Sequence, residues 1–359
     1  KDLISEEKVM IGITKEGYVK RASTRSFTAS QTIGLKTDDA LIFEKELNTL
    51  DTLLIFTNLG NYVFLPVYKI DEQKWKDLGV YLNNIVPIER NERVIKVLSV
   101  SNFNTGQMLL LATSNGMMKQ TKLSDFEVSR YTKSLKAMRL SNNDELVFVD
   151  INDRNNILSI SEKGYALRFR ALELPMYGLQ AGGVKCMSLS EDDKLVSALY
   201  VNPGDDFIML TSRGHVIKDV VEELPIYNRN RRGILVIEHQ KANPHLAVSA
   251  ARLSRQQQKE DVEVLIVTET GSLKSVVSEL KYSGNKFGKK MFDDDNLGRG
   301  YSIEIFDAKE EILENQAVEK VSKKKVKPAE PIDLLKEEIV TKDNKKIHLN
   351  RFDLFDEDE

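Results

Sequence analysis

Short apolar runs alternate with polar turns along most of this chain. Each run holds four or five residues, drawn mainly from Val, Ile, Leu, Met and Phe, and is followed at once by Thr or Ser. The six runs span residues 9–13, 53–56, 108–112, 157–160, 207–210 and 264–267. Helices would need longer segments with a period of 3.6 residues, so the pattern predicts buried strands.

A Gly stands three residues after the Thr or Ser in every copy. The six pairs are Thr14/Gly17, Thr57/Gly60, Thr113/Gly116, Ser161/Gly164, Thr211/Gly214 and Thr268/Gly271. Each stretch predicts a tight hairpin turn, because Gly readily adopts the positive φ that such turns require. A second strand is then expected to leave the turn and complete a hairpin.

The spacing of the six copies indicates the architecture. The turn glycines lie 43, 56, 48, 50 and 57 residues apart. This period is too long for repeats of two helices and suits one four-stranded propeller blade per copy. We therefore expect an all-β domain over residues 1–306, built of six blades of four antiparallel strands.

The strand after the turn carries a basic residue three or four positions beyond the Gly in five of the six copies. These residues are Lys20, Lys119, Arg168, Lys218 and Lys274. The second copy has Val63 and Phe64 there instead, and acidic turns lie in a different part of the repeat. Because radial repetition aligns equivalent positions, we expect these cations on one outer rim, outside the core.

Composition and charge do not by themselves identify a partner. The chain is 41% hydrophobic and 30% charged, as in ordinary globular proteins. Its one cysteine, Cys186, rules out an intramolecular disulfide framework and fits a reducing cytoplasm. The net charge is −3, but residues 307–359 contribute −4, which leaves residues 1–306 at +1. A nearly neutral body could bind DNA only through a one-sided cationic patch.

The remaining residues predict a tail. Residues 307–337 are rich in Glu and Lys and favour a charged, solvated linker. Residues 338–359 regain apolar residues, for which a short docked strand or hairpin with an acidic end and a frayed tail are equally compatible. The strand pattern begins almost at Lys1, so we expect a piece of a longer protein.

No catalytic or metal-binding pattern is found in the sequence. It has no P-loop, so ATP hydrolysis would belong to another chain. The four histidines lack metal-ligand spacing with Cys186, and no nucleophile stands with a base. We therefore expect no catalytic residue, no metal and no cofactor in this chain.

The stretch Glu7-Lys8-Val9-Met10-Ile11-Gly12-Ile13-Thr14-Lys15-Glu16-Gly17-Tyr18-Val19-Lys20-Arg21 resembles the first blade of a known domain. That domain is the C-terminal domain of the A subunits of bacterial type IIA topoisomerases, DNA gyrase and topoisomerase IV. Later copies, such as residues 113–119 and 161–168, resemble the same repeat, and the resemblance covers about residues 5–306. It implies a six-bladed β-pinwheel, whose neighbouring blades exchange strands and whose positively charged rim bends double-stranded DNA.

The resemblance also implies partners and a location. The parent protein would be an ATP-dependent type II DNA topoisomerase, in which this domain works with the remainder of its own A subunit. An ATPase B subunit would complete the enzyme, which would act on the nucleoid in the cytoplasm. The DNA-cleaving tyrosine of the family lies in a separate N-terminal region, so no tyrosine here is assigned that role.

Carried over by position, the resemblance implies a set of DNA-binding candidates. They are Lys20, Arg21, Arg25, Lys36, Lys119, Lys122, Arg130, Lys133, Arg168, Arg170, Lys185, Lys218, Arg229, Arg231, Arg232, Lys274, Lys286, Lys289 and Lys290. Contacts from Lys and Arg to phosphates would supply affinity that is independent of sequence and sensitive to salt.

One departure from the family pattern bears on the subfamily. The A subunits of gyrase carry a box of the form Q-[KR]-R-G-G-[KR]-G after the basic strand of the first blade. The corresponding stretch, residues 30–36, keeps Gln31, Gly34 and Lys36 but lacks the tandem cations. The chain therefore looks more like its topoisomerase IV counterpart, which relaxes and decatenates DNA, with a degenerate gyrase as the alternative.

The main hypothesis is a non-catalytic module that engages duplex DNA and presents it for strand passage. A protein-interaction propeller is the competing class, and its affinity would rest on exposed apolar or aromatic anchors that resist moderate salt. A propeller enzyme would need convergent polar groups at a central channel, and no such set is evident in the sequence.

Overall fold

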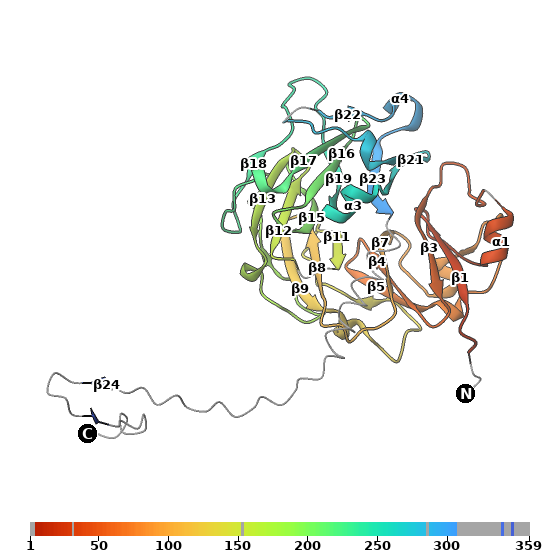
Figure 1. Ribbon diagram of the computed structural model, residues 1–359. Helices are drawn as coiled ribbons and strands as arrows, with labels where there is room; N and C mark the ends of the chain where they lie inside the picture. Colours follow the sequence, from red (N-terminus) through yellow and green to blue (C-terminus); the bar gives the residue numbers. More distant parts are fainter. Residues whose placement is uncertain are drawn as a thin grey trace. The chain divides into compact units, whose positions relative to one another are not determined.

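The computed structural model describes residues 4–30, 32–151, 154–284, 287–306, 339–340 and 346–347. The chain divides into two units, residues 1–312 and 313–359. The first unit consists of antiparallel sheets arranged as the blades of a propeller (Figure 1). In the second, β24 (Ile339–Val340) pairs with β25 (Lys346–Ile347), while the predicted linker 307–337 lies outside the described residues.

The first three blades each contain four strands. Blade 1 has β1 (Lys8–Thr14), β2 (Tyr18–Ser23), β3 (Leu41–Asn48) and β6 (Val80–Tyr81). Blade 2 has β4 (Thr52–Thr57), β5 (Asn61–Pro66), β7 (Val94–Val100) and β10 (Leu135–Lys136). Blade 3 has β8 (Met108–Thr113), β9 (Met117–Lys122), β11 (Leu146–Ile151) and β14 (Val184–Lys185).

Blades 4 and 5 have the same arrangement of four strands, and blade 6 has three strands among the described residues. Blade 4 has β12 (Asn156–Ser161), β13 (Tyr165–Arg170), β15 (Leu195–Val201) and β18 (Ile234–Leu235). Blade 5 has β16 (Asp206–Thr211), β17 (His215–Val220), β19 (Ala247–Leu253) and β22 (Lys289–Lys290). Blade 6 has β20 (Glu263–Thr268), β21 (Ser272–Val276) and β23 (Gly300–Phe306).

Short helices connect these strands. The α-helices are α1 (Thr24–Ala29), α2 (Leu82–Ile85), α3 (Arg255–Glu260) and α4 (Asp294–Leu297). The 3-10 turns are η1 (Val67–Lys69), η2 (Leu123–Phe126), η3 (Ala171–Glu173), η4 (Val221–Glu223) and η5 (Val277–Glu279). In the described part of the chain, no helix is both long and apolar enough to cross a membrane.

Neighbouring blades exchange strands. The outermost strand of each of the first five blades comes from the next repeat, as where β6 pairs with β2 through Val19 and Val80. This matches the pinwheel arrangement that the family resemblance implies. Within the described residues β21 has no such outer neighbour, so blade 6 has three strands where four were expected. The prediction of an all-β, six-bladed fold is confirmed.

The T-x-x-G stretches form the predicted hairpin turns. At the first, the Gly17 N–H donates to the Thr14 carbonyl at 2.9 Å, and the Tyr18 N–H donates to the Thr14 hydroxyl at 3.1 Å. Gly17 has φ +91°, and the turn glycines of blades 2 to 5 also have positive φ. Gly271 in blade 6 does not, because its hairpin is shifted and pairs Val267 with Ser272. The positive φ predicted there is wrong.

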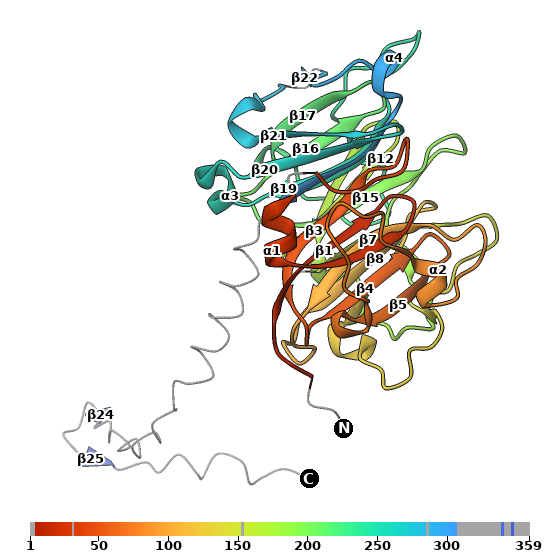
Figure 2. The same cartoon turned by 90° about the vertical axis from the view of Figure 1, so that its right-hand side faces the viewer.

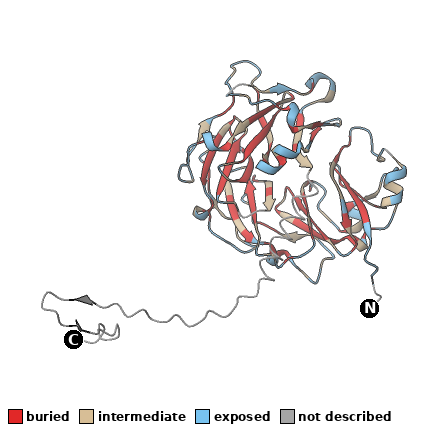
Figure 3. Cartoon of the chain, in the orientation of Figure 1, coloured by how far each residue is buried: buried red, intermediate tan, exposed pale blue. Residues whose placement is uncertain are grey.

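The core lies between neighbouring blades. Leu110 and Ala112 of blade 3 pack in one cluster with Ile157 and Leu167 of blade 4. The middle strands β4, β12 and β16 are buried along their whole length, because sheets cover both of their faces (Figures 2 and 3). This explains why the runs in the sequence are continuous rather than alternating. Blades 1 and 6 meet in a smaller cluster that contains Ala40, Leu265 and Val267.

Candidate nucleic-acid interface

Four of the five recurrent cations are buried. The exposed fractions are 2% for Lys20, 0% for Lys119, 5% for Arg168 and 7% for Lys218. The prediction that these residues lie on the rim and outside the core is therefore wrong for all four. Their charged groups contact the neighbouring repeat instead of solvent.

Lys20 and Lys119 donate hydrogen bonds to backbone carbonyls of the following blade's loop. The Lys119 ammonium lies 2.7 Å from the Gly178 oxygen and 3.0 Å from the Leu179 oxygen. The Lys20 ammonium donates to the Trp75 carbonyl at 2.6 Å. Both loops lead into exchanged strands, so these lysines hold the segments that bring those strands to their partners.

Burial has an electrostatic consequence for these two lysines. Desolvation lowers the pKa of Lys20 and of Lys119 from 10.5 to about 8, although Asp77 and Asp125 respectively act to raise it. Both side chains still carry their charge near neutral pH. The accepting carbonyl groups therefore offset part of the cost of burying an ammonium ion.

Arg168 holds a 3-10 turn rather than a loop. One of its terminal nitrogens donates to the carbonyls of Val221 at 3.1 Å and Leu224 at 3.0 Å, around η4. In the preceding blade the Gln120 side chain makes the same pair of bonds around η3, to Ala171 at 3.1 Å and Leu174 at 2.8 Å. Both residues stand four positions beyond a turn Gly. The position four residues beyond the turn Gly therefore marks, in the sequence, a side chain that can hold the next 3-10 turn. A search for basic residues alone misses Gln120 at this position.

The last two recurrent cations also have partners. The Lys218 ammonium lies 4.6 Å from the centroid of the Tyr282 ring. Lys274 is exposed, 3.8 Å from a Glu44 carboxylate oxygen and 5.2 Å from the Phe306 ring centroid.

The strand register explains why these cations do not share one surface. Lys20 and Lys119 pair with the residue two before the Thr of their hairpin, Gly12 and Leu111. Arg168 and Lys218 pair with the residue three before the Ser or Thr of their hairpin, Leu158 and Ile208. Successive strand residues point to opposite faces of a sheet, so the two pairs face opposite sides of their blades.

Most of the remaining candidates are exposed to solvent. The exposed ones are Arg25, Lys36, Lys122, Arg130, Lys133, Arg170, Lys185, Arg231, Arg232, Lys289 and Lys290. Arg21 and Arg229 are half-buried, and Lys286 lies outside the described residues. Lys289 and Lys290 pair with Glu279 and Asp293.

Five of these candidates, Arg170, Lys185, Arg229, Arg231 and Arg232, form what we call the outer-edge cluster. Arg229 donates to the Lys185 carbonyl at 2.9 Å, and Arg231 bridges to Met187 two residues further on. Arg170 and Arg229 line the same open surface hollow. Across the described ranges, no ammonium or guanidinium group of the cluster forms an ion pair with a carboxylate, although the Arg229 backbone N–H donates to Glu173 at 2.9 Å.

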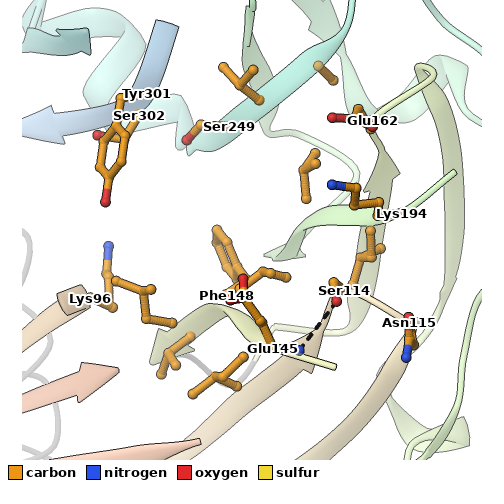
Figure 4. A pocket seen from close by; sticks show the side chains of 18 of the residues that line it. Lys96, Ser114, Asn115, Glu145, Phe148, Glu162, Lys194, Ser249, Tyr301 and Ser302 are labelled. Carbon is orange, nitrogen blue, oxygen red and sulfur yellow. Dashed lines mark hydrogen bonds between the residues drawn. The ribbon is translucent and has the colours of Figure 1, made fainter. Parts of the chain in front are cut away.

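Carboxylates gather at the hairpin-turn end of the blades. Asp39, Asp144 and Asp193 each accept a backbone N–H from a neighbouring hairpin turn, at 3.0 Å in all three cases. Asp193 lines a central pocket of about 570 Å³, and Asp144 stands between two residues that line it, Asn143 and Glu145 (Figure 4). The acidic turns of the sequence are therefore structural, and they lie in a part of the repeat separate from the outer-edge cluster.

The central pocket contains charged groups, several of which are already paired. Lys96 pairs with Glu304 at 2.9 Å, and Arg93 pairs with Glu145 at 2.7 Å. Figure 4 shows Ser114 and Glu145 joined by a hydrogen bond on one side and Tyr301 with Ser302 on another. No group of three or more His, Cys, Asp or Glu residues that could hold a metal occurs among the described residues.

Residues 51–101, 107–153 and 155–202 match the family model of the DNA gyrase C-terminal domain, a β-propeller. The A subunit of DNA topoisomerase 4 from Bacillus subtilis (strain 168) is 33% identical over 302 residues, covering 83% of this chain and 37% of that protein. The corresponding protein of Staphylococcus aureus is 35% identical over 299 residues, covering 82% and 37%. The chain thus spans little more than a third of the length of these relatives.

Solved structures agree with these matches. The crystal structure of the C-terminal domain of DNA topoisomerase IV has a TM-score of 0.74 and 32% identity, over 89% of this chain and 100% of that one. A DNA gyrase A C-terminal domain has a TM-score of 0.66 and 20% identity, over 84% and 100%, and supports the fold alone. The chain therefore belongs to the family of C-terminal β-propeller domains of bacterial type IIA topoisomerase A subunits, and it is more similar to those of topoisomerase IV.

Proposed function

We propose that this domain binds and bends duplex DNA for a topoisomerase IV-like enzyme and carries no catalytic step itself. The observation that supports the proposal is the outer-edge cluster. It contains five cations on neighbouring elements, and none of them is neutralised by a carboxylate within the described part of the chain. Such a group attracts phosphates even though the body as a whole is nearly neutral.

The separation of charge supports the same function. A duplex lying along the outer edge would meet cations there, whereas the carboxylates of the hairpin turns would disfavour its approach to the central pocket. Phosphate contacts carry no sequence information, so binding would show little sequence preference. The proposal needs no metal, nucleotide or other cofactor in this domain.

The parent enzyme would supply the chemistry. We propose that the rest of an A subunit cleaves DNA and that an ATPase B subunit drives strand passage, with this domain presenting the duplex to be relaxed or decatenated. The complex would then work on nucleoid DNA in the cytoplasm.

Charge reversal tests the role of the outer-edge cluster. A triple variant with Lys185→Glu, Arg231→Glu and Arg232→Glu should weaken binding of a 40-bp duplex at least about tenfold at low salt and flatten its salt dependence. Fluorescence anisotropy at several salt concentrations measures both effects. The matched control, Lys69→Glu with Lys241→Glu and Lys259→Glu, makes the same change in net charge at exposed sites elsewhere.

Equal loss of binding in the two variants would show that net charge, and not the cluster, controls affinity. Tight binding by the unaltered domain that ignores salt would contradict a phosphate-based interface and favour an apolar one. Circular dichroism and thermal melting of each variant confirm that the fold is retained.

A further inference from the structure

Leu172 is an apolar side chain held almost wholly in water. It is the middle residue of η3 and is 95% exposed, the highest exposure among the large apolar side chains of the described residues. The corresponding positions of η2, η4 and η5 hold Ser124, Glu222 and Ser278, and Tyr68 in η1 is partly covered and contacts the Tyr131 hydroxyl. Among the 3-10 turns that the structure describes, only η3 has a leucine at this position.

The backbone around Leu172 is firmly held. The Gln120 side chain donates to the carbonyls of Ala171 and Leu174 on either side of it. The Ala171 N–H donates to the Asn155 carbonyl at 2.9 Å, and the Leu174 N–H closes the turn onto Ala171 at 3.0 Å. The backbone that carries the exposed Leu172 side chain is therefore fixed on both sides of the residue.

The surroundings of Leu172 are cationic. Leu172 lines an open hollow of about 690 Å³ together with Arg170, Glu173, Asn228, Arg229 and Asn230. Glu173 is the only carboxylate in this lining, and it already accepts the Arg229 backbone N–H at 2.9 Å. Within the described residues, the guanidinium groups of Arg170 and Arg229 form no ion pair with a carboxylate. An apolar side chain between them suits a polyanion that also offers an apolar surface between its charged chains.

Duplex DNA is such a polyanion, because the apolar faces of its stacked base pairs lie between two phosphate backbones. Proteins that bend DNA often insert a leucine or similar apolar side chain between two base pairs from the minor groove, while nearby arginines contact the flanking backbone. Arginine is also common at protein–protein interfaces, so a protein partner is one outcome of the test below. The neighbouring cations Lys185, Arg231 and Arg232, which form no ion pair with a carboxylate in the described part of the chain, favour the polyanion.

We propose that Leu172 is a wedge that partly enters a base step of the bound duplex and kinks it, with Arg170 and Arg229 on the adjacent phosphates. This inference rests on the proposed function and adds a residue that controls DNA shape rather than affinity. Most of the affinity would come from the phosphate contacts, so loss of the wedge should reduce bending far more than binding.

Bending and binding can be measured separately on the full chain. A 40-bp duplex labelled at both ends reports bending by energy transfer, and anisotropy reports affinity. Leu172→Ala should reduce the bend clearly while changing the dissociation constant less than about threefold, since the cations remain. Leu172→Phe should retain the bend, because Phe is also an effective wedge. Leu78→Ala, an exposed leucine in the second repeat, is the matched control.

The outcomes separate the two proposals. If the unaltered chain does not bind duplex DNA, the proposed function fails and the wedge with it. If it binds and Leu172→Ala bends DNA as well as the unaltered chain, the wedge is wrong and the proposed function stands. A loss of affinity at unchanged bend would also overturn the wedge. The wedge would also be wrong if Leu172→Ala left bending unchanged but weakened association with a purified A-subunit core. That result would show that Leu172 contacts a protein.

Discussion

At the residue scale, the position of a cation relative to the exchanged segments determines what its charge does. Lys119 and Lys122 stand three residues apart on β9, yet Lys119 is fully buried against two carbonyls and Lys122 is exposed. A buried hydrogen-bonded ammonium is expensive to disturb, because its removal leaves acceptors without donors. An exposed ammonium costs little to remove.

We therefore expect Lys119→Ala to lower the free energy of unfolding by about 2–4 kcal/mol, since the Gly178 and Leu179 carbonyls lose a charged donor. Urea denaturation followed by circular dichroism measures the change. Lys122→Ala on the same strand is the control and should stay within about 0.5 kcal/mol of the unaltered chain. Equal stabilities for the two variants would show that the Lys119 contacts contribute nothing to the fold.

At the scale of elements, each exchanged strand depends on the segment that delivers it. The outer strands β14 and β18 pair through only two residues each, so the pairing alone is weak. The polar side chain that holds the preceding 3-10 turn supplies a further connection between blades. In blade 3 this side chain is neutral Gln120 and in blade 4 it is charged Arg168, with the same two kinds of acceptor.

This equivalence predicts that Arg168→Gln is tolerated better than Arg168→Ala. Glutamine at the same position can donate to the Val221 and Leu224 carbonyls, whereas alanine cannot. We expect a loss of about 2–3 kcal/mol in unfolding free energy for Arg168→Ala and less than half of that for Arg168→Gln. Thermal or urea unfolding of both variants provides the comparison. Similar losses would mean that the charge of Arg168, and not its hydrogen bonds, stabilises η4.

At the scale of the whole molecule, the junction between blades 6 and 1 differs from the other five. The five have an exchanged strand, but among the described residues none reaches β21. The Lys15 ammonium crosses the junction instead, and donates to the carbonyls of Thr268 at 3.2 Å and Glu269 at 2.5 Å. The ion pair between Glu44 and Lys274 adds to it.

The unpaired edge should open more readily than its equivalents. Amide hydrogen exchange followed by mass spectrometry should show residues 272–276 of β21 exchanging at least about tenfold faster than residues 215–220 of β17. The first two residues of β17 pair with β22, through His215–Lys290 and Val216–Lys289, and the Lys218 N–H donates to the Ser283 hydroxyl at 3.1 Å. Comparable protection of the two strands would indicate that another segment covers β21 in solution.

The blade count, the hairpins and the family could be predicted because each depends on residues close together in the sequence. The Thr14 carbonyl and hydroxyl bind N–H groups three and four residues away, so the turn can be recognised from a few letters. The candidate site was predicted less well. The sequence does not show whether the partner of a basic residue in a strand is a phosphate or a backbone carbonyl of the next repeat. A search for basic residues also misses a neutral residue with the same role, such as Gln120.

The six β repeats could be recognised from the sequence, since strand length, turn geometry and apolar runs are local properties. Which cations remain available to a partner depends on the tertiary structure. Strand exchange brings backbone carbonyls of one repeat against the second strand of the preceding blade, where they enclose Lys20, Lys119 and Arg168. It leaves four members of the outer-edge cluster in solvent and Arg229 half-buried. That division depends on contacts between different repeats, which no pattern within one repeat contains.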